Sequence, residues 1–140
     1  MRTKQRRGRR LASLAQAVTL AAALGGALAC EDGSGPVGET VTLLGTVTEA
    51  DGGEPVEGLY VHLLYGIGVA SAYVAGDDTD ADGAYLVSGV VPAESCHLVR
   101  LAVSAEAEFD PFATSIATRT VGRCGAGVVH FTVPPGSGGG

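Results

Sequence analysis

The chain has 140 residues, enough for one domain, and its charge is divided sharply along its length. Six of the nine basic residues lie in the first ten positions, whereas residues 31–140 set three arginines against fifteen carboxylates, a formal charge of −12. Nucleic-acid binding needs clustered lysine and arginine to neutralise phosphates, so this acidity argues against a nucleic-acid partner.

The first 29 residues have the organisation of an export signal. A basic segment, residues 1–10, precedes a run of small and apolar residues, 11–29. A basic region, an apolar region and a small-residue cleavage site are typical of a secretory signal peptide. A transmembrane helix is the alternative, but this run is rich in alanine and contains Gly25-Gly26, so it is weakly hydrophobic for a permanent anchor.

The end of this segment, Ala27-Leu28-Ala29-Cys30, resembles the lipobox of bacterial lipoproteins, in which the cysteine is diacylated and becomes the new N-terminus. The family pattern prefers leucine in place of Ala27 and a small residue in place of Leu28. An ordinary Ala-x-Ala cleavage site before an unrelated cysteine is the alternative. The resemblance implies that residues 30–38 are a lipidated Cys30 and a flexible Gly/Ser/Pro linker that hold an exported domain on a membrane of the cell envelope.

The chain has three cysteines, Cys30, Cys96 and Cys124. If Cys30 is lipidated, the other two are left to pair, and exported proteins meet an oxidising compartment where disulfides persist. We therefore expect a Cys96–Cys124 disulfide, which stabilises the fold by about 3.5 kcal/mol on the chain-entropy model. A reactive or metal-binding thiol beside His97 is the alternative, but adjacent residues of a strand point to opposite faces.

From residue 39 onward, valine, threonine, leucine and tyrosine recur with period 2 in short runs bounded by glycine, proline or aspartate. This pattern is typical of an antiparallel all-β domain, and seven strands on about 95 residues favour a Greek-key β-sandwich over residues 39–133. Residues 134–140 are expected to be a disordered tail. The predicted strands are Thr40–Thr48, Gly58–Tyr65, Ala70–Ala75, Ala84–Ser88, His97–Ala105, Ser115–Val121 and Gly127–Val133.

Period 2 also assigns side chains to faces. Tyr60, His62 and Leu64 alternate with core positions of the second predicted strand and are expected to point outward, as is His130 of the last strand. We therefore expect these histidines to be solvated rather than to bind a metal. Tyr60, Leu64 and Tyr73 are a candidate apolar face for a ligand or partner, and the alternative is that they are single exposed apolar residues.

Three segments, GTV at 45–47, PVEGLYVHL at 55–63 and TDADGAYLVSGVVP at 79–92, resemble the carboxypeptidase-regulatory-like domain. This family is a transthyretin-like seven-stranded sandwich common in exported bacterial proteins. The resemblance implies the fold and a non-catalytic structural or binding module, and it speaks for fold far more than for function. The matching positions are Gly45, Val47, Pro55, Val56, Gly58, Val61, Thr79, Asp80, Gly83, Tyr85, Gly89 and Val90.

Residues 78–83 carry carboxylates at positions 1, 3 and 5 and glycine at position 6 of a calcium-loop pattern, which makes Asp78, Asp80 and Asp82 a candidate Ca²⁺ site. The rest of the loop does not fit, because position 12 is Gly89 instead of a bidentate glutamate and the predicted flanks are strands. A β-turn in which Asp80 and Asp82 bind their own backbone is the favoured interpretation, and no cofactor is expected.

No Ser, His and Asp constellation indicates hydrolytic catalysis, and we do not expect an enzyme. The sequence predicts a non-catalytic lipoprotein of the cell envelope, exported and anchored by lipid in the periplasm or at the cell surface. Its β-sandwich would act as a structural or binding module for a protein or glycan ligand. The alternative is a carbohydrate-binding module of similar fold, for which planar aromatic rings on one face are expected.

Overall fold

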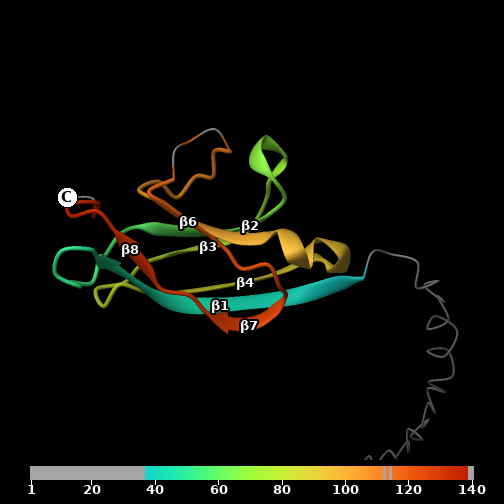
Figure 1. The fold of residues 1–140 in the computed structure, drawn as a ribbon, viewed down its shortest axis with the longest axis horizontal. Helices are drawn as coiled ribbons and strands as arrows, with labels where there is room; N and C mark the ends of the chain where they lie inside the picture. The colour runs from blue at the N-terminus through green and yellow to red at the C-terminus, as the bar shows by residue number, and fades with distance from the viewer. Residues whose placement is uncertain (1–36, 112, 114, 139–140) are drawn as a thin grey trace, which may run out of the picture. The chain divides into compact units, whose positions relative to one another are not determined.

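The computed structural model of the chain describes residues 37–111, 113 and 115–138, which form two packed sheets and almost no helix (Figure 1). The predicted signal peptide, Cys30 and the linker up to residue 36 lie outside the described residues. Within the described part of the chain, no helix has the length and apolar character needed to cross a membrane.

The first sheet is built around the long strand β1 (Gly38–Glu49). Strand β4 (Ala84–Pro92) pairs antiparallel with one edge of β1. Strands β7 (Gly125–Val128) and β8 (Phe131–Val133) both pair with the other edge, and they run parallel to β1. The prediction of an entirely antiparallel domain is therefore wrong for this edge. The chain reaches β1 near the start of that strand, where Gly125 pairs with Val41, and then runs in the same direction as β1.

The second sheet has the order β3–β2–β5–β6, and every pair in it is antiparallel. Its strands are β2 (Tyr60–Tyr65), β3 (Ala72–Asp78), β5 (Val99–Ser104) and β6 (Ala117–Thr120). The chain crosses to this sheet after β1 and crosses back after β3, so that β4 lies beside β1. In a Greek key, too, the fourth strand returns to lie beside the first.

Two short 3-10 helices depart from the prediction that nothing after residue 39 is helical. The first, η1 (Gly68–Ala70), lies between β2 and β3, and the second, η2 (Ala93–Leu98), lies between β4 and β5. Single 3-10 turns are common connectors and need no long-range apolar periodicity, so a pattern search does not detect them. Because η2 includes His97 and Leu98, strand β5 begins two residues later than predicted.

The seventh predicted strand is divided into β7 and β8 by Val129 and His130. At this break, the Tyr85 hydroxyl donates a hydrogen bond to the Val129 carbonyl oxygen at 2.6 Å, and the Thr46 backbone N–H donates to His130 Nδ1 at 3.2 Å. A Cβ atom at Gly45 would lie 1.7 Å from the same carbonyl oxygen. The break therefore requires glycine at position 45, where one backbone passes directly over another.

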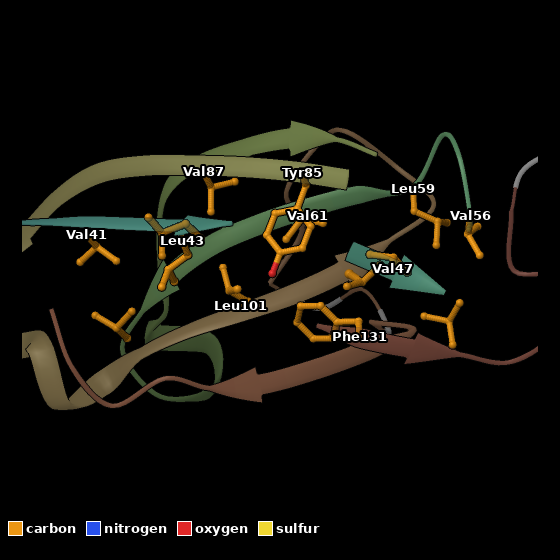
Figure 2. Close-up of a cluster of buried hydrophobic side chains, with 14 of the residues drawn as sticks. Val41, Leu43, Val47, Val56, Leu59, Val61, Tyr85, Val87, Leu101 and Phe131 are labelled. Atoms are coloured by element: carbon orange, nitrogen blue, oxygen red, sulfur yellow. The ribbon is translucent and has the colours of Figure 1, made fainter. Parts of the chain in front are cut away.

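The hydrophobic core lies between the two sheets, and the described residues that form it include no charged side chain (Figure 2). Alternate residues of each strand enter it, as the period-2 pattern predicts, and Tyr85 is the one polar-tipped side chain among them. Burial raises the pKa of the Tyr85 phenol, an effect that Arg119 partly opposes. The core residues are Val41, Leu43, Val47, Val56, Leu59, Val61, Leu63, Tyr85, Val87, Val91, Val99, Leu101, Val103, Phe131 and Val133.

The predicted disulfide is confirmed. Cys96 in η2 and Cys124 just before β7 are bonded, with their Cα atoms 5.0 Å apart and a sequence separation of 28. Both half-cystines pack against the edge of the core. The bond joins the β4–β5 connection to the β6–β7 connection. Each of these connections runs between the first sheet and the second, so the disulfide ties together two crossings between the sheets.

The segment that follows β8 is not the free tail that the sequence predicts. The Gly136 backbone N–H donates to Glu49 Oε1 at 2.9 Å, and the Ser137 hydroxyl donates to the Pro134 carbonyl oxygen at 2.6 Å. A carboxylate at the end of β1 thus supplies the acceptor that holds this turn. The correction applies to Pro134–Gly138, and residues 139–140 lie outside the described part of the chain.

Candidate functional site

The acidic turn after β3 forms the β-turn favoured from the sequence, with the Asp80 side chain as an acceptor and Asp82 contributing its backbone N–H. Asp80 Oδ1 accepts hydrogen bonds from the backbone N–H groups of Asp82 and Ala84, each at 2.9 Å, and Gly83 has φ of 68°. The Asp80 carboxylate therefore stabilises the turn by accepting these two hydrogen bonds, while Asp78 is exposed at the end of β3. Across the described residues, no three His, Cys, Asp or Glu side chains gather in an arrangement that could hold a metal ion.

The second sheet carries a covered outer face instead of the solvated one that the sequence predicts. His62 on β2 points outward from the core, yet only 3 % of its surface is exposed. The β5–β6 segment, residues 105–116, lies over this side of the sheet (Figure 1), and its residues 112 and 114 are outside the described ones. The prediction of a solvated His62 is therefore wrong, because alternation gives the face of a side chain but not what lies above it.

His62 is held by a short hydrogen-bond network. Its Nε2 lies 2.7 Å from Ser104 Oγ and 3.2 Å from the Glu106 carbonyl oxygen, and the Ser104 hydroxyl donates to that same oxygen at 2.7 Å. Because the serine hydrogen is used in this way, Ser104 Oγ accepts from His62, which places the imidazole hydrogen on Nε2. His62 Nδ1 then has a lone pair to share, and it is buried without a hydrogen-bond partner in the described structure.

Burial lowers the pKa of the His62 imidazole, and the Glu106 carbonyl opposes this only in part. The imidazole is therefore neutral at neutral pH, since its ordinary pKa is already about 6.5. A neutral imidazole with one free acceptor nitrogen suits a hydroxyl or amine donor, and it does not supply a positive charge.

Three aromatic rings surround the imidazole. The ring centroid of His62 lies 4.8 Å from that of Tyr60, 6.0 Å from that of Tyr73 and 5.8 Å from that of Phe109. Tyr73 and Phe109 are stacked, with centroids 5.8 Å apart and planes 20° from parallel. This aromatic cluster joins strands β2 and β3 to the β5–β6 segment.

The half-buried phenol of Tyr60 is the second titratable group of the cluster with a clear pKa shift. Hydrogen bonding to the Tyr73 side chain, followed by burial and by the charges of nearby aspartates, raises the pKa of Tyr60 to about 12. The Tyr60 ring lies directly over Gly76 of β3, where a Cβ atom would come within 2.2 Å of it. Because Gly76 has no side chain, there is room for the Tyr60 ring to pack against β3 at this position.

A cavity of about 270 Å³ opens beside the aromatic cluster. Ala102 and Ser104 of β5 lie at its base with His62, and the β5–β6 segment forms its walls. The walls include the acidic residues Glu106, Glu108 and Asp110, the ring of Phe109, and the smaller side chains of Ala113, Ser115 and Ile116. This combination suits a small neutral or cationic ligand with hydrogen-bond donors, and the carboxylates disfavour an anion.

The predicted apolar face of Tyr60, Leu64 and Tyr73 is not a single exposed surface. Tyr73 is 44 % exposed, whereas Leu64 is 2 % exposed. Arg100, the residue opposite Leu64 on β5, donates to the Ser71 hydroxyl next to η1, so the η1 loop folds over this end of the sheet. Sequence reasoning missed the cavity, because the segment that walls it was only a short connection, residues 106–114, between two predicted strands, although loops often carry functional residues.

No family model matches the chain, and no curated protein matches it. Among solved structures, a 9R-lipoxygenase from Cyanothece PCC8801 superposes with a TM-score of 0.48 at 15 % identity, covering 69 % of this chain and 17 % of that one. The shaft pilin SpaA from Lactobacillus rhamnosus GG superposes with a TM-score of 0.36 at 12 % identity, covering 70 % of this chain and 50 % of that one. The chain spans at most half the length of these neighbours, and the likenesses assign no function.

Proposed function

We propose that this chain is a non-catalytic lipoprotein of the bacterial cell envelope, whose β-sandwich is a structural or binding module held on a membrane by acylated Cys30. One observation carries the proposal. The disulfide uses Cys96 and Cys124, so Cys30 has no cysteine partner within the chain. It also stands directly after the small residue Ala29, at the end of a basic and apolar leader.

The resemblance to the carboxypeptidase-regulatory-like domain supports the module part of this proposal. Several of the matching positions have structural roles in this fold. Gly45 passes under the Val129 carbonyl group, Gly83 has a positive φ in the turn, and the Tyr85 hydroxyl binds the broken strand. Such residues maintain a sandwich and do not create a reaction centre, which is consistent with a module without catalytic function.

Labelling cells with a fatty-acid analogue tests the anchor. We expect the wild-type chain to incorporate the label and Cys30→Ala to lose it, because the cysteine is the acylated residue. A double variant, Cys96→Ala with Cys124→Ala, serves as the matched control and should keep the label. An unlabelled wild type, or label that persists in Cys30→Ala, would contradict the proposal.

A carbohydrate-binding module is the second candidate function, and the stacked pair of Tyr73 and Phe109 favours it. Planar rings beside a small cavity with carboxylate acceptors suit the apolar face and hydroxyl groups of a sugar. A glycan array with the purified chain tests this candidate. Any glycan bound by the wild type should be lost in Tyr73→Ala and kept in Leu44→Ala, and an array without binding counts against it.

A further inference from the structure

The outer face of the first sheet carries a row of exposed apolar side chains. Leu44 of β1 lies opposite Leu86 of β4 on one side and Val128 of β7 on the other. These side chains are 47 %, 55 % and 60 % exposed. Three large apolar residues in register across three strands form a continuous patch, unlike the isolated exposed residues that are ordinary on protein surfaces.

The patch is part of a face without charge. Val90, 62 % exposed, lies opposite Thr40 near the start of β1 and extends the apolar surface toward that end of the strand. The outward positions of β1, β4 and β7 carry no charged residue, although residues 31–140 have a formal charge of −12. These positions are Thr40, Thr42, Leu44, Thr46, Ala84, Leu86, Ser88, Val90, Ala126 and Val128.

We propose that this uncharged face of the first sheet lies against the lipid bilayer that holds Cys30, an inference that rests on the proposed function. The position of the tether supports a membrane as the occupant. Only residues 31–37 separate Cys30 from β1, so the strand begins within about 25 Å of the acyl chains. The tether ends at Val37, which is 66 % exposed. Val37 lies three residues before Thr40, the residue of β1 that pairs with Val90.

Charge gives the same orientation. The carboxylates of Glu106, Glu108 and Asp110 lie along the cavity over the second sheet, on the opposite side of the sandwich. A phospholipid surface that carries anionic lipids repels that side and leaves the uncharged face as the favourable one. The module would then rest on the first sheet and present the cavity away from the membrane.

The acyl anchor supplies the affinity, and the face supplies the orientation. A few half-exposed aliphatic side chains give weak partitioning by themselves, whereas a short tether raises their effective concentration at the surface. The unacylated chain is therefore not expected to bind vesicles, and the test needs the acylated protein.

The chain has no tryptophan, so a single introduced tryptophan is an unambiguous reporter. Leu44→Trp places it on the uncharged face, and Tyr73→Trp places it on the opposite face at nearly equal exposure, 47 % against 44 %. Acylated full-length protein carrying either substitution is reconstituted into phosphatidylcholine vesicles with and without brominated acyl chains. We expect bromine to quench about half of the Leu44→Trp emission, because an interfacial side chain reaches the acyl boundary, and to leave Tyr73→Trp unchanged.

The other outcomes overturn the proposal. Equal quenching of both reporters would mean no preferred face, and no quenching of Leu44→Trp would mean that the face does not touch lipid. Emission of Leu44→Trp that shifts to shorter wavelength with protein concentration, without vesicles, would mean that a second copy covers the face. Val128→Trp, on the same row, repeats the test if Leu44→Trp fails to fold.

Mass spectrometry of each preparation separates this proposal from the one on which it rests. A chain purified without acyl groups on Cys30 overturns the proposed function, and the membrane-facing orientation falls with it. An acylated chain that sediments with vesicles but keeps Leu44→Trp unquenched overturns the orientation alone.

Discussion

The two sheets use the same alternation of side chains, but their outer faces are opposites. Leu44 on β1 and Leu64 on β2 both point away from the core, and their exposed fractions are 47 % and 2 %. The difference comes from the connections. The β5–β6 segment and the η1 loop fold over the second sheet, whereas nothing in the described structure covers the apolar row of the first. An outward position is therefore exposed only where no connection crosses it.

The largest expected effect is a loss of stability on substituting a glycine, and we compare one glycine from each sheet. In Gly45→Ala the new Cβ atom would meet the Val129 carbonyl oxygen of the broken strand, which is backbone and cannot move aside. We expect a loss of at least about 3 kcal/mol in the free energy of unfolding, measured by urea denaturation. In Gly76→Ala the obstacle is the ring of Tyr60, which can rotate, so the expected loss is about 1 kcal/mol. Equal losses would mean that the broken strand is not constrained by its contact with β1.

The second prediction concerns the two outward leucines. Leu64→Ala removes a buried side chain and leaves a cavity, with an expected loss of about 3 kcal/mol, whereas Leu44→Ala should change stability by less than about 0.5 kcal/mol. The midpoint of urea unfolding measures both. A loss for Leu44→Ala comparable to that of Leu64→Ala would show that the outer face of the first sheet is covered in solution.

The third prediction uses the buried imidazole of the second sheet. Because burial lowers the pKa of His62 in the fold, the unfolded chain binds its proton first as the pH falls. The stability contribution is therefore present above pH 6.5 and is lost as the pH falls from about 6.5 toward the lower pKa of the folded state. His62→Gln keeps a side-chain hydrogen-bond donor without titrating, and it should flatten the curve of unfolding free energy between pH 7 and pH 5.

The titratable groups around His62 are Tyr60 on its own strand, Tyr73 on β3 and the acidic side chains of the β5–β6 segment. His62→Gln leaves all of these groups in place, so the difference between the two pH curves reports on His62 itself. Identical pH dependence of the wild type and His62→Gln would therefore contradict the assignment of a buried, neutral histidine.

The smallest expected effect is spectroscopic. Tyr73→Phe removes the hydrogen-bonding hydroxyl that does most to raise the pKa of Tyr60. The ultraviolet titration of tyrosinate should then show one phenol moving from about 12 toward the ordinary value of 10. Tyr65→Phe, which lies on the same strand as Tyr60 but points to its other face, should leave that transition in place.

The sequence was sufficient for features that depend on local pattern. Alternation located most strand positions and the core, and turn chemistry accounted for Asp80 and Gly83. The count of three cysteines, with Cys30 assigned to lipidation, and the oxidising compartment paired Cys96 with Cys124. The break between β7 and β8 was not visible, because apolar and polar residues alternate without interruption from Val129 to Val133. That break depends on Gly45 and Tyr85, which are more than forty residues away in the chain and meet it only in the folded sheet.

The candidate site was missed for a similar reason. Tyr60 and Tyr73 were recognised as outward aromatic residues, and His62 was placed on the same face. Their environment depends on a connection whose path no periodicity fixes. Phe109 reaches them from that connection, so the cluster exists only through tertiary packing.

Strand β4, at one edge of the first sheet, is protected against pairing with a strand of another chain. Asp77 of β3 accepts a hydrogen bond from the backbone N–H of Leu86 at 2.8 Å, on the edge of β4 that faces away from β1. Another chain that added a strand there would have to displace this charged hydrogen bond. This contact therefore disfavours the growth of fibres by strand addition along the free edge of β4.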